Sequence, residues 1–168
     1  EVVYRQLDAD ARLACEQWAA TVRAARGEFT SAARHYILGG QTKRAVRLWF
    51  AHREREIDRG QAALALAVFA AVPRERLAAA DQRLLAMIRA ELRALSGESE
   101  LALDDLNAVR WSAADELAPR AHELRGDMKV RLGQVAAGLA EYQAGLHAID
   151  AQLTRQRVQL HVKRGSGQ

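Results

Sequence analysis

A spacing of small and large residues recurs along the chain and limits the folds that it can adopt. In each copy a glycine is followed five residues later by a small residue, and four residues further on by a large apolar or aromatic one. The copies are Gly27/Ala32/Tyr36, Gly40/Ala45/Trp49, Gly60/Ala65/Phe69, Gly97/Ala102/Leu106 and Gly133/Gly138/Tyr142. Glycine readily adopts the left-handed conformation that ends a helix, and residues four apart share one helix face. The spacing therefore predicts short helices that are joined by glycine turns and packed closely through their small residues.

The composition favours a fully helical chain. Apolar residues make up 49% of the 168 residues but aromatic residues only 5%, so we expect a core built mainly from Ala and Leu. The two prolines, Pro73 and Pro119, impose few breaks on helices, and no alternating apolar run of strand length stands out. The fold class predicted is all-α. Helices are expected over residues 6–25, 28–38, 42–58, 61–71, 79–95, 99–109, 113–132, 134–147 and 149–164.

One of these helix boundaries depends on a local capping signal. Ser112 and Asp115 have the spacing of a capping box, which places the helix start at residue 113. Pro119 lies inside that predicted helix, which is therefore either continuous or broken at the proline.

Residues 119–146 place small residues, a turn glycine and a ring at regular positions. The small residues are Gly126, Gly138 and Gly145. Gly133 is the turn glycine and Tyr142 supplies the ring. This arrangement resembles the tetratricopeptide repeat (TPR) family, whose small residues occupy repeat positions 8, 20 and 27 and whose aromatic residue occupies position 24. Pro119 would begin the first helix of this repeat, where its missing N–H costs nothing.

Two further segments resemble the same repeat less completely. One has Ala90, Gly97, Ala102 and Leu106 in these roles, and the other has Ala20, Gly27, Phe29, Ala32, Tyr36 and Gly39. The family's Trp at position 4 is replaced by Glu16, Ala86 and His122. The resemblance implies TPR-like antiparallel hairpins stacked in an irregular right-handed α-solenoid. Within a single domain over 1–168, the expected hairpins are 6–39, 42–72, 79–110 and 113–148, followed by a final helix over 149–164.

TPR arrays bind other proteins through a concave face formed by the first helix of each hairpin. By resemblance, the inward positions of two neighbouring repeats form an apolar strip and a mixed-charge strip. They are Leu84, Met87, Glu91 and Leu95 in one repeat and Arg120, Glu123, Asp127 and Arg131 in the next. Such a pair of strips suits an amphipathic or extended peptide segment, although ordinary solvated or interhelical contacts explain the same residues equally well. Trp111, in a connection beside Arg110, is a further candidate contact residue.

The composition of the predicted helices, rich in Arg, Ala and Leu, also resembles that of the helical sensor regions of bacterial STAND-type signalling ATPases. That resemblance implies a sensor or scaffold region of a larger signalling protein. The chain begins at Glu1 without methionine, and the apolar residues Leu153, Leu160 and Val162 of the last predicted helix lack a cover. We therefore expect a fragment whose partner is a protein or peptide segment, or another domain of the same parent, with end-to-end self-association as an open alternative.

The positive charge of the chain is confined to its end. The net charge is +4, and the last 18 residues supply all of it through Arg155, Arg157, Lys163 and Arg164. Residues 1–150 have equal numbers of basic and acidic side chains. Nucleic-acid binding through this basic helix is an alternative function, but specific binding typically draws on roughly 6–10 phosphate contacts, so packing within the parent protein is favoured.

The sequence contains only weak signals for residue clusters that could support catalysis or metal binding. The string Gly39-Gly40-Gln41-Thr42-Lys43 has the ingredients of a phosphate loop in the wrong order. His52 and Glu56 stand at i and i+4, but zinc needs at least three protein ligands and neighbouring arginines repel cations. A solvated helix face is the preferred interpretation there. We therefore expect neither enzymatic activity nor a cofactor or metal.

The neighbours of one cysteine and three tryptophans in the sequence predict whether these side chains are buried. Cys15, Trp18 and Trp49 lie at apolar positions and are predicted to be in the core, with Cys15 an inert thiol, whereas Trp111 is expected to be partly exposed. No run approaches the roughly 18 apolar residues that a membrane helix needs, so the predicted location is the cytoplasm.

Overall fold

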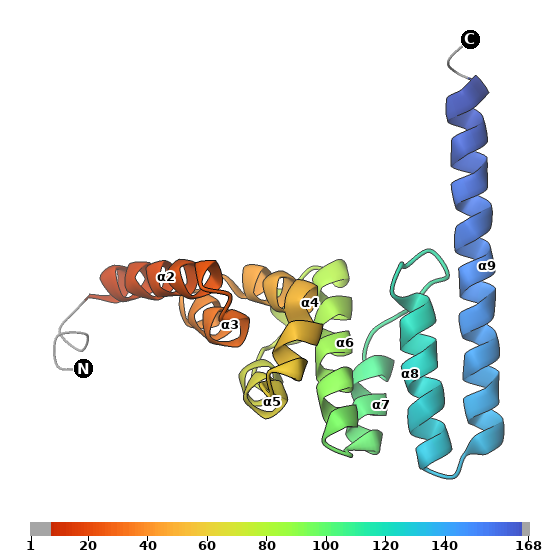
Figure 1. Cartoon of the computed structure of the whole chain (residues 1–168), viewed down its shortest axis with the longest axis horizontal. Coiled ribbons are helices and arrows are strands. Elements are labelled where there is room, and N and C mark those ends of the chain that lie inside the picture. The colour runs from red at the N-terminus through yellow and green to blue at the C-terminus, as the bar shows by residue number, and fades with distance from the viewer. Residues whose placement is uncertain (1–7, 166–168) are drawn as a thin grey trace. The chain divides into compact units, whose positions relative to one another are not determined.

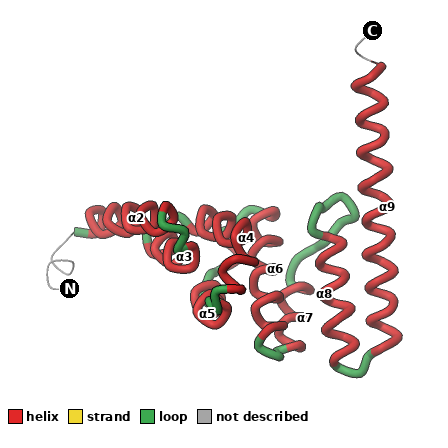
Figure 2. The backbone as a smooth tube through the Cα atoms, in the orientation of Figure 1, coloured by secondary structure: helices red, strands yellow, loops and turns green. Residues whose placement is uncertain are grey.

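The computed structural model describes the backbone of residues 8–165 and the side chains of residues 8–159. This part of the chain is helical and contains no β-strand, which confirms the all-α prediction (Figures 1 and 2). The helices are α2 (Ala9–Ala25), α3 (Phe29–Leu38), α4 (Thr42–Asp58), α5 (Ala62–Ala70), α6 (Ala79–Leu95), α7 (Ser99–Asn107), α8 (Ala118–Arg131) and α9 (Val135–Gly165), with a 3₁₀ turn at Arg74–Arg76. None of these helices is both long enough and apolar enough to cross a bilayer.

The chain divides into two compact units, with the boundary between Ser96 and Gly97. Unit 1 comprises the described residues up to Ser96, from α2 to α6, and unit 2 comprises those from Gly97, from α7 to α9. The boundary falls inside the predicted hairpin 79–110.

The turn glycines are those that the sequence predicts. Gly27, Gly40, Gly60, Gly97 and Gly133 have φ values of 73°, 75°, 74°, 79° and 78°. The turn at Gly60 shows the bonding pattern: its N–H donates to Ile57 O at 2.8 Å, and the following Gln61 N–H donates to Glu56 O at 2.9 Å. These paired bonds satisfy carbonyls that would otherwise be orphaned at the end of α4.

The small and large residues of the recurrent spacing form the core of unit 1. Its small members, Ala32, Ala45 and Ala65, are fully buried, which allows the helices to approach closely. Trp49 on α4 is also fully buried, and its ring meets the Phe69 ring of α5 edge-on at a centroid distance of 5.4 Å. The prediction that Trp49 is in the core is confirmed.

In unit 2, α8 and α9 run antiparallel and touch through glycines (Figure 1). Gly126, Gly138 and Gly145 are all buried. A Cβ on Gly126 would overlap the Tyr142 ring, and one on Gly138 would lie 2.6 Å from Val130 Cγ2. The predicted role of these glycines as close-approach positions is therefore confirmed.

A contact that the sequence did not suggest joins successive helices within each unit. In unit 1, the Arg89 guanidinium on α6 donates to the carbonyls of Phe69, Ala70 and Val72 at the end of α5, at 2.5–3.0 Å. In unit 2, Arg125 on α8 donates to Leu106 O at the end of α7 at 2.7 Å. Burial lowers the pKa of Arg125, against an opposing effect of the Glu141 charge. Both arginines stand eight residues before a turn glycine, so the two contacts are equivalent.

Two predicted helix boundaries are wrong. The expected helices 134–147 and 149–164 are one continuous helix, α9, because no glycine in the left-handed conformation and no proline interrupts the chain near residue 148. Helix α8 begins at Ala118 instead of residue 113. The Ser112 N–H does donate to the Asp115 carboxylate at 2.6 Å, but this bond closes a turn ahead of the proline rather than a helix.

Two core assignments are also wrong. Trp18 is 71% exposed, because it stands two residues before the buried Ala20, roughly 200° around the helix. Cys15 is exposed as well. Both side chains are close to apolar residues in the sequence, but neither lies on the buried face of α2.

Candidate functional site

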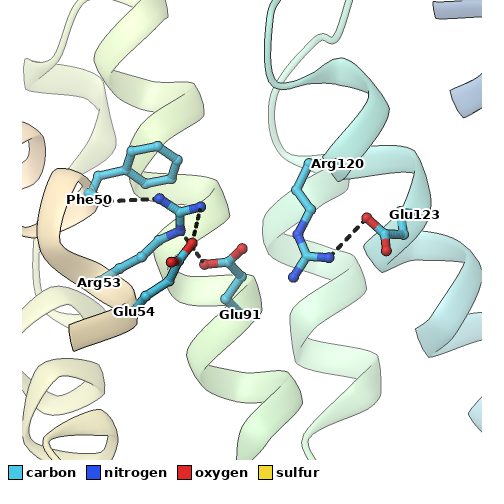
Figure 3. A network of polar contacts seen from close by, with 6 residues as sticks. All are labelled: Phe50, Arg53, Glu54, Glu91, Arg120 and Glu123. Carbon is cyan, nitrogen blue, oxygen red and sulfur yellow. Dashed lines mark hydrogen bonds and ion pairs between the residues drawn. The ribbon is translucent and has the colours of Figure 1, made fainter. Parts of the chain in front are cut away.

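The predicted apolar strip lies on α6 and is largely engaged within the protein. Met87 and Glu91 are buried, Leu84 is half-buried, and Leu95 is exposed. The Glu91 carboxylate lies 3.3 Å from the Arg53 guanidinium of α4. Arg53 in turn lies over the Phe50 ring and donates to the Phe50 carbonyl at 3.0 Å (Figure 3). Glu91 is therefore an internal ion-pair partner, and only Leu95 of this strip offers an open apolar surface.

The predicted mixed-charge strip on α8 is more open. Arg120 and Glu123 are exposed and form an ion pair at 2.9 Å (Figure 3). Asp127 accepts a hydrogen bond from the Tyr142 hydroxyl of α9 at 2.8 Å, and this bond, with the nearby charges, raises the pKa of Tyr142. Arg131, at the end of α8, is exposed. Whether any of these residues contacts a partner stays a prediction.

A groove in unit 2 brings Arg120 and Glu123 together with apolar side chains of α9. It has a volume of 480 Å³. Its lining residues are Glu116, Pro119, Arg120, Glu123, Tyr142, Gly145, Leu146 and Ile149. The α9 members Leu146 and Ile149 are 62% and 42% exposed. One wall of the groove is therefore polar and the other is apolar.

The apolar wall continues along α9 beyond the groove. We call Leu139, Leu146, Ile149 and Leu153 the α9 stripe. Their exposed fractions are 55%, 62%, 42% and 49% respectively. Residues three, four or seven apart on a helix share one face, so the stripe is continuous. Sequence reasoning missed it because a helix break was expected near residue 148, although the regular leucine spacing was a visible signal.

A polar cluster that does not line the groove also joins α8 and α9. His122 Nδ1 lies 2.7 Å from Glu141 Oε2, and Lys129 Nζ lies 2.6 Å from Glu141 Oε1. Burial raises the pKa of Glu141, but the hydrogen bonds from Lys129 and His122 outweigh it, so the pKa is lowered overall. An equivalent pair, Glu16 and His35 at 2.6 Å, joins α2 to α3. One member of each pair, Glu16 and His122, is the residue predicted to replace the Trp of the resembled repeat.

The suspected metal position on α4 has a structural role. Glu56 is buried and accepts hydrogen bonds from the Thr30 N–H and hydroxyl at 2.8 and 2.6 Å, at the N-terminal turn of α3 where a negative charge is favourable. His52 stacks on the Phe29 ring with centroids 3.7 Å apart. The interpretation of these two residues as a solvated face is therefore wrong. The described part of the chain contains no group of three His, Cys, Asp or Glu side chains that could hold a metal ion.

Other predicted surface residues also have internal contacts. Trp111 is half-buried, as expected, and its indole N–H donates to Leu106 O at 2.8 Å. Arg155 donates to the Ala113 carbonyl, whereas Arg157 is exposed. The side chains of Leu160, Val162, Lys163 and Arg164 lie outside the described residues.

A basic groove of 690 Å³ in unit 1 was also considered as a binding site. It is lined by Lys43, Arg44 and Arg47 among others. Arg44 lies over the Tyr36 ring, and Arg47 is 2.5 Å from the buried carboxylate of Asp81. Two of its three cations therefore already have partners, which makes it a weaker candidate than the groove in unit 2.

These features define an all-α chain of helices joined by glycine turns, with an open groove and an apolar stripe in unit 2. A comparison with known protein families finds no matching family model. A comparison with curated proteins finds no match either.

Proposed function

We propose that the chain is a non-catalytic protein-interaction module that binds a helical segment along α8 and α9. The observation that supports this most is the exposure of the α9 stripe beside the Arg120–Glu123 pair. Four large apolar side chains on one helix face, each about half exposed, form a patch of the kind that marks an interaction site. The adjoining ion pair supplies polar groups at its edge.

A helical occupant suits this surface best. A single straight apolar stripe matches the apolar face of an amphipathic helix, whose anchors recur at three- and four-residue intervals. The polar side of the groove, formed by Glu116, Arg120 and Glu123, would pair with charges beside that face and set the orientation. An extended peptide is the alternative occupant, but the described residues offer it no strand edge for main-chain pairing.

The absence of catalytic activity and a sensor or scaffold role in a larger bacterial signalling protein are parts of the same proposal. The polar clusters of the described residues have structural partners: Glu56 holds the first turn of α3, and Glu141 joins α8 to α9. The sensor role is supported by the resemblance between the composition of these helices and that of the helical sensor regions of STAND-type signalling proteins.

A library of displayed amphipathic helical peptides tests the binding role directly. The full chain serves as bait, and Kd values of the selected peptides are measured for the wild type and for Leu146→Glu by fluorescence anisotropy. The matched control is Leu38→Glu, at a 52% exposed leucine of α3 in unit 1. We expect Leu146→Glu to weaken binding at least about tenfold, which corresponds to ~1.4 kcal/mol, and the control to leave it unchanged. Peptides that bind Leu146→Glu as well as the wild type, or a library that yields no binder, would contradict the proposal.

A further inference from the structure

The open side of α9 corresponds to a side that earlier helices bury. Tyr36, Phe69 and Leu106 stand nine residues after the turn glycines that precede α3, α5 and α7, and each is at most 1% exposed. In each case the next helix of the chain, α4, α6 or α8, packs on the helix that carries them. Tyr142 has the same position in α9 but lines the open groove, and Leu139, one turn earlier, is 55% exposed. Within the described residues, α9 therefore lacks the neighbour that the other three helices have.

The groove in unit 2 corresponds to the seat of a helix in unit 1. There, α6 packs on both α4 and α5. Arg47 of α4, thirteen residues before its turn glycine, lies 2.5 Å from the Asp81 carboxylate of α6. Arg120 has that position in α8 and lines the groove together with Tyr142 of α9. The surface of α8 and α9 thus matches the surface of α4 and α5 that α6 covers.

Helix α6 meets the helix before it through three buried positions. They lie twelve, nine and five residues before the turn glycine and are held by Leu85, Ile88 and Leu92. All three side chains are at most 1% exposed and belong to the same core cluster as Phe69 of α5. Helix α4 is an exception, because it meets α3 through His52 and Glu56.

Helix α8 buries the same three positions. They are held by Ala121, Leu124 and Met128, which are at most 4% exposed. These residues lie roughly 140–200° around α8 from Gly126, the residue that meets α9, and α7 also packs on α8. The three positions thus mark the side through which α6 and α8 face the helix before them.

The same side of α2 is open. Its three positions are held by Cys15, Trp18 and Val22. Cys15 is exposed, Trp18 is 71% exposed and Val22 is half-buried. Three alanines share this side of the helix, and we define the α2 face as Ala11, Ala14, Cys15, Trp18, Val22 and Ala25. No member is charged, although the outermost helix of a stacked array normally has a polar outer side.

We propose that the α9 stripe and its groove bind the α2 face of a second copy of this chain, so that copies associate head to tail. This inference rests on the proposed function, because it names the partner of the same surface. The contact repeats between copies the packing of α5 on α6 and of α7 on α8. Trp18 is the largest apolar side chain that it covers.

One difference from the internal contacts makes α2 a better match for α9 than a copy of α6 or α8. Arg89 and Arg125, eight residues before the turn glycines of those helices, bond carbonyls at the ends of α5 and α7. Helix α9 instead continues past the end of α8 (Figure 1), so the Tyr142 carbonyl is bonded inside α9 and needs no arginine. At this position α2 has Ala19, which buries no cation without a partner.

Two blocked variants of the full chain test the proposal by sedimentation velocity. A head-to-tail contact joins two different surfaces of each copy, so wild-type oligomers should grow beyond the dimer as the concentration rises. Trp18→Glu blocks the α2 face and Leu146→Glu blocks the α9 stripe, and each protein alone should be a monomer with unchanged circular dichroism. Their equimolar mixture should form dimers and nothing larger, because each chain keeps one working surface. Leu38→Glu, the control in unit 1, should assemble like the wild type.

The single cysteine reports which surface is covered. Cys15 is exposed on the α2 face, so binding of a second copy should slow its alkylation by N-ethylmaleimide. In the equimolar mixture above the dimer Kd, Cys15 should be protected severalfold in the Leu146→Glu chain, whose α2 face is occupied, and unprotected in the Trp18→Glu chain. Mass spectrometry distinguishes the two chains by their masses.

The outcomes separate this inference from the proposed function. A wild type that stays monomeric at about 100 μM overturns the head-to-tail contact. A blocked variant that still self-associates overturns it too, because its remaining surface then pairs with itself, and so does an equimolar mixture in which no dimer forms. If a monomeric wild type still selects helical peptides through Leu146, the proposed function stands and only the identity of the partner is refuted.

Discussion

Replacing Gly126 with alanine should destabilise unit 2, although the same change in an ordinary exposed helix is stabilising. Alanine is favoured over glycine in a helix interior by about 1 kcal/mol. At Gly126, however, a Cβ would lie inside the van der Waals boundary of the Tyr142 ring. Overpacking of this kind costs about 1–3 kcal/mol. Taking ~2 kcal/mol for the overlap, the net effect is a loss of ~1 kcal/mol.

The overlap can be isolated by removing the ring. In a Tyr142→Ala background the space beside residue 126 is open, so Gly126→Ala should then stabilise the protein by about 1 kcal/mol. The sign of the effect thus reverses between the two backgrounds, and the coupling free energy of the double-mutant cycle is about 2 kcal/mol. A difference between backgrounds is more secure than either single value, because changes in the unfolded chain largely cancel.

Denaturant titration followed by circular dichroism measures these free energies of unfolding. Since the chain has two compact units, hydrogen exchange of the α8 and α9 amides should accompany it and report the opening of unit 2 alone. A Gly126→Ala protein that is more stable than the wild type, or a coupling free energy near zero, would refute the reasoning, because α8 and α9 would then not meet at Gly126 and Tyr142.

Four further predictions follow from contacts described above. Gly133→Ala has open space for its Cβ but a φ of 78°, so it should lower the free energy of unfolding by about 1–2 kcal/mol through backbone strain alone, in the same titrations. Glu56→Ala removes the acceptor of two Thr30 hydrogen bonds and should destabilise unit 1 by about 1–3 kcal/mol, with faster exchange of the first α3 amides. Arg89→Lys loses the planar fork that reaches three carbonyls and should cost about 1–2 kcal/mol in thermal unfolding, whereas an unchanged transition would mean that these bonds add nothing. The pKa of Glu141 is lowered in the folded state. Its carboxylate therefore stabilises the fold above the ordinary pKa of 4.5, and this effect is lost as the pH falls through the lower pKa of the folded state. Glu141→Gln should be less stable than the wild type at pH 7, and the difference in the free energy of unfolding should shrink in strongly acidic solution.

The sequence alone was sufficient for the helices that end at a glycine. A left-handed glycine leaves a local signal, and the fully buried Ala32 and Trp49 follow it at a fixed interval. The spacing therefore predicts both the turns and the buried residues that follow each turn. The start of α8 was misplaced because a Ser–Asp pair also closes a simple turn, and only Pro119 distinguishes the two outcomes.

The candidate site was only partly predictable. Arg120 and Glu123 were identified through the family resemblance, but the α9 residues opposite them were not. Repeat positions specify which first-helix residues face inward, and they contain no information about a second helix that continues past its partner. Likewise, nothing local to Glu91 indicates the ion pair with Arg53, which lies 38 positions earlier in the chain.

The paired acid and histidine of the first and last hairpins have a consequence for how such chains diverge. Glu16 lies on the first helix and His35 on the second, whereas in the other hairpin His122 comes first and Glu141 second. The members stand eleven residues before and eight residues after the turn glycine in both cases. An exchange of the two residues thus preserves the contact while changing the identity at both positions. Two hairpins related by such an exchange differ at both positions, so a position-by-position comparison of their sequences misses the contact that they share, whereas the pairing of the side chains reveals it.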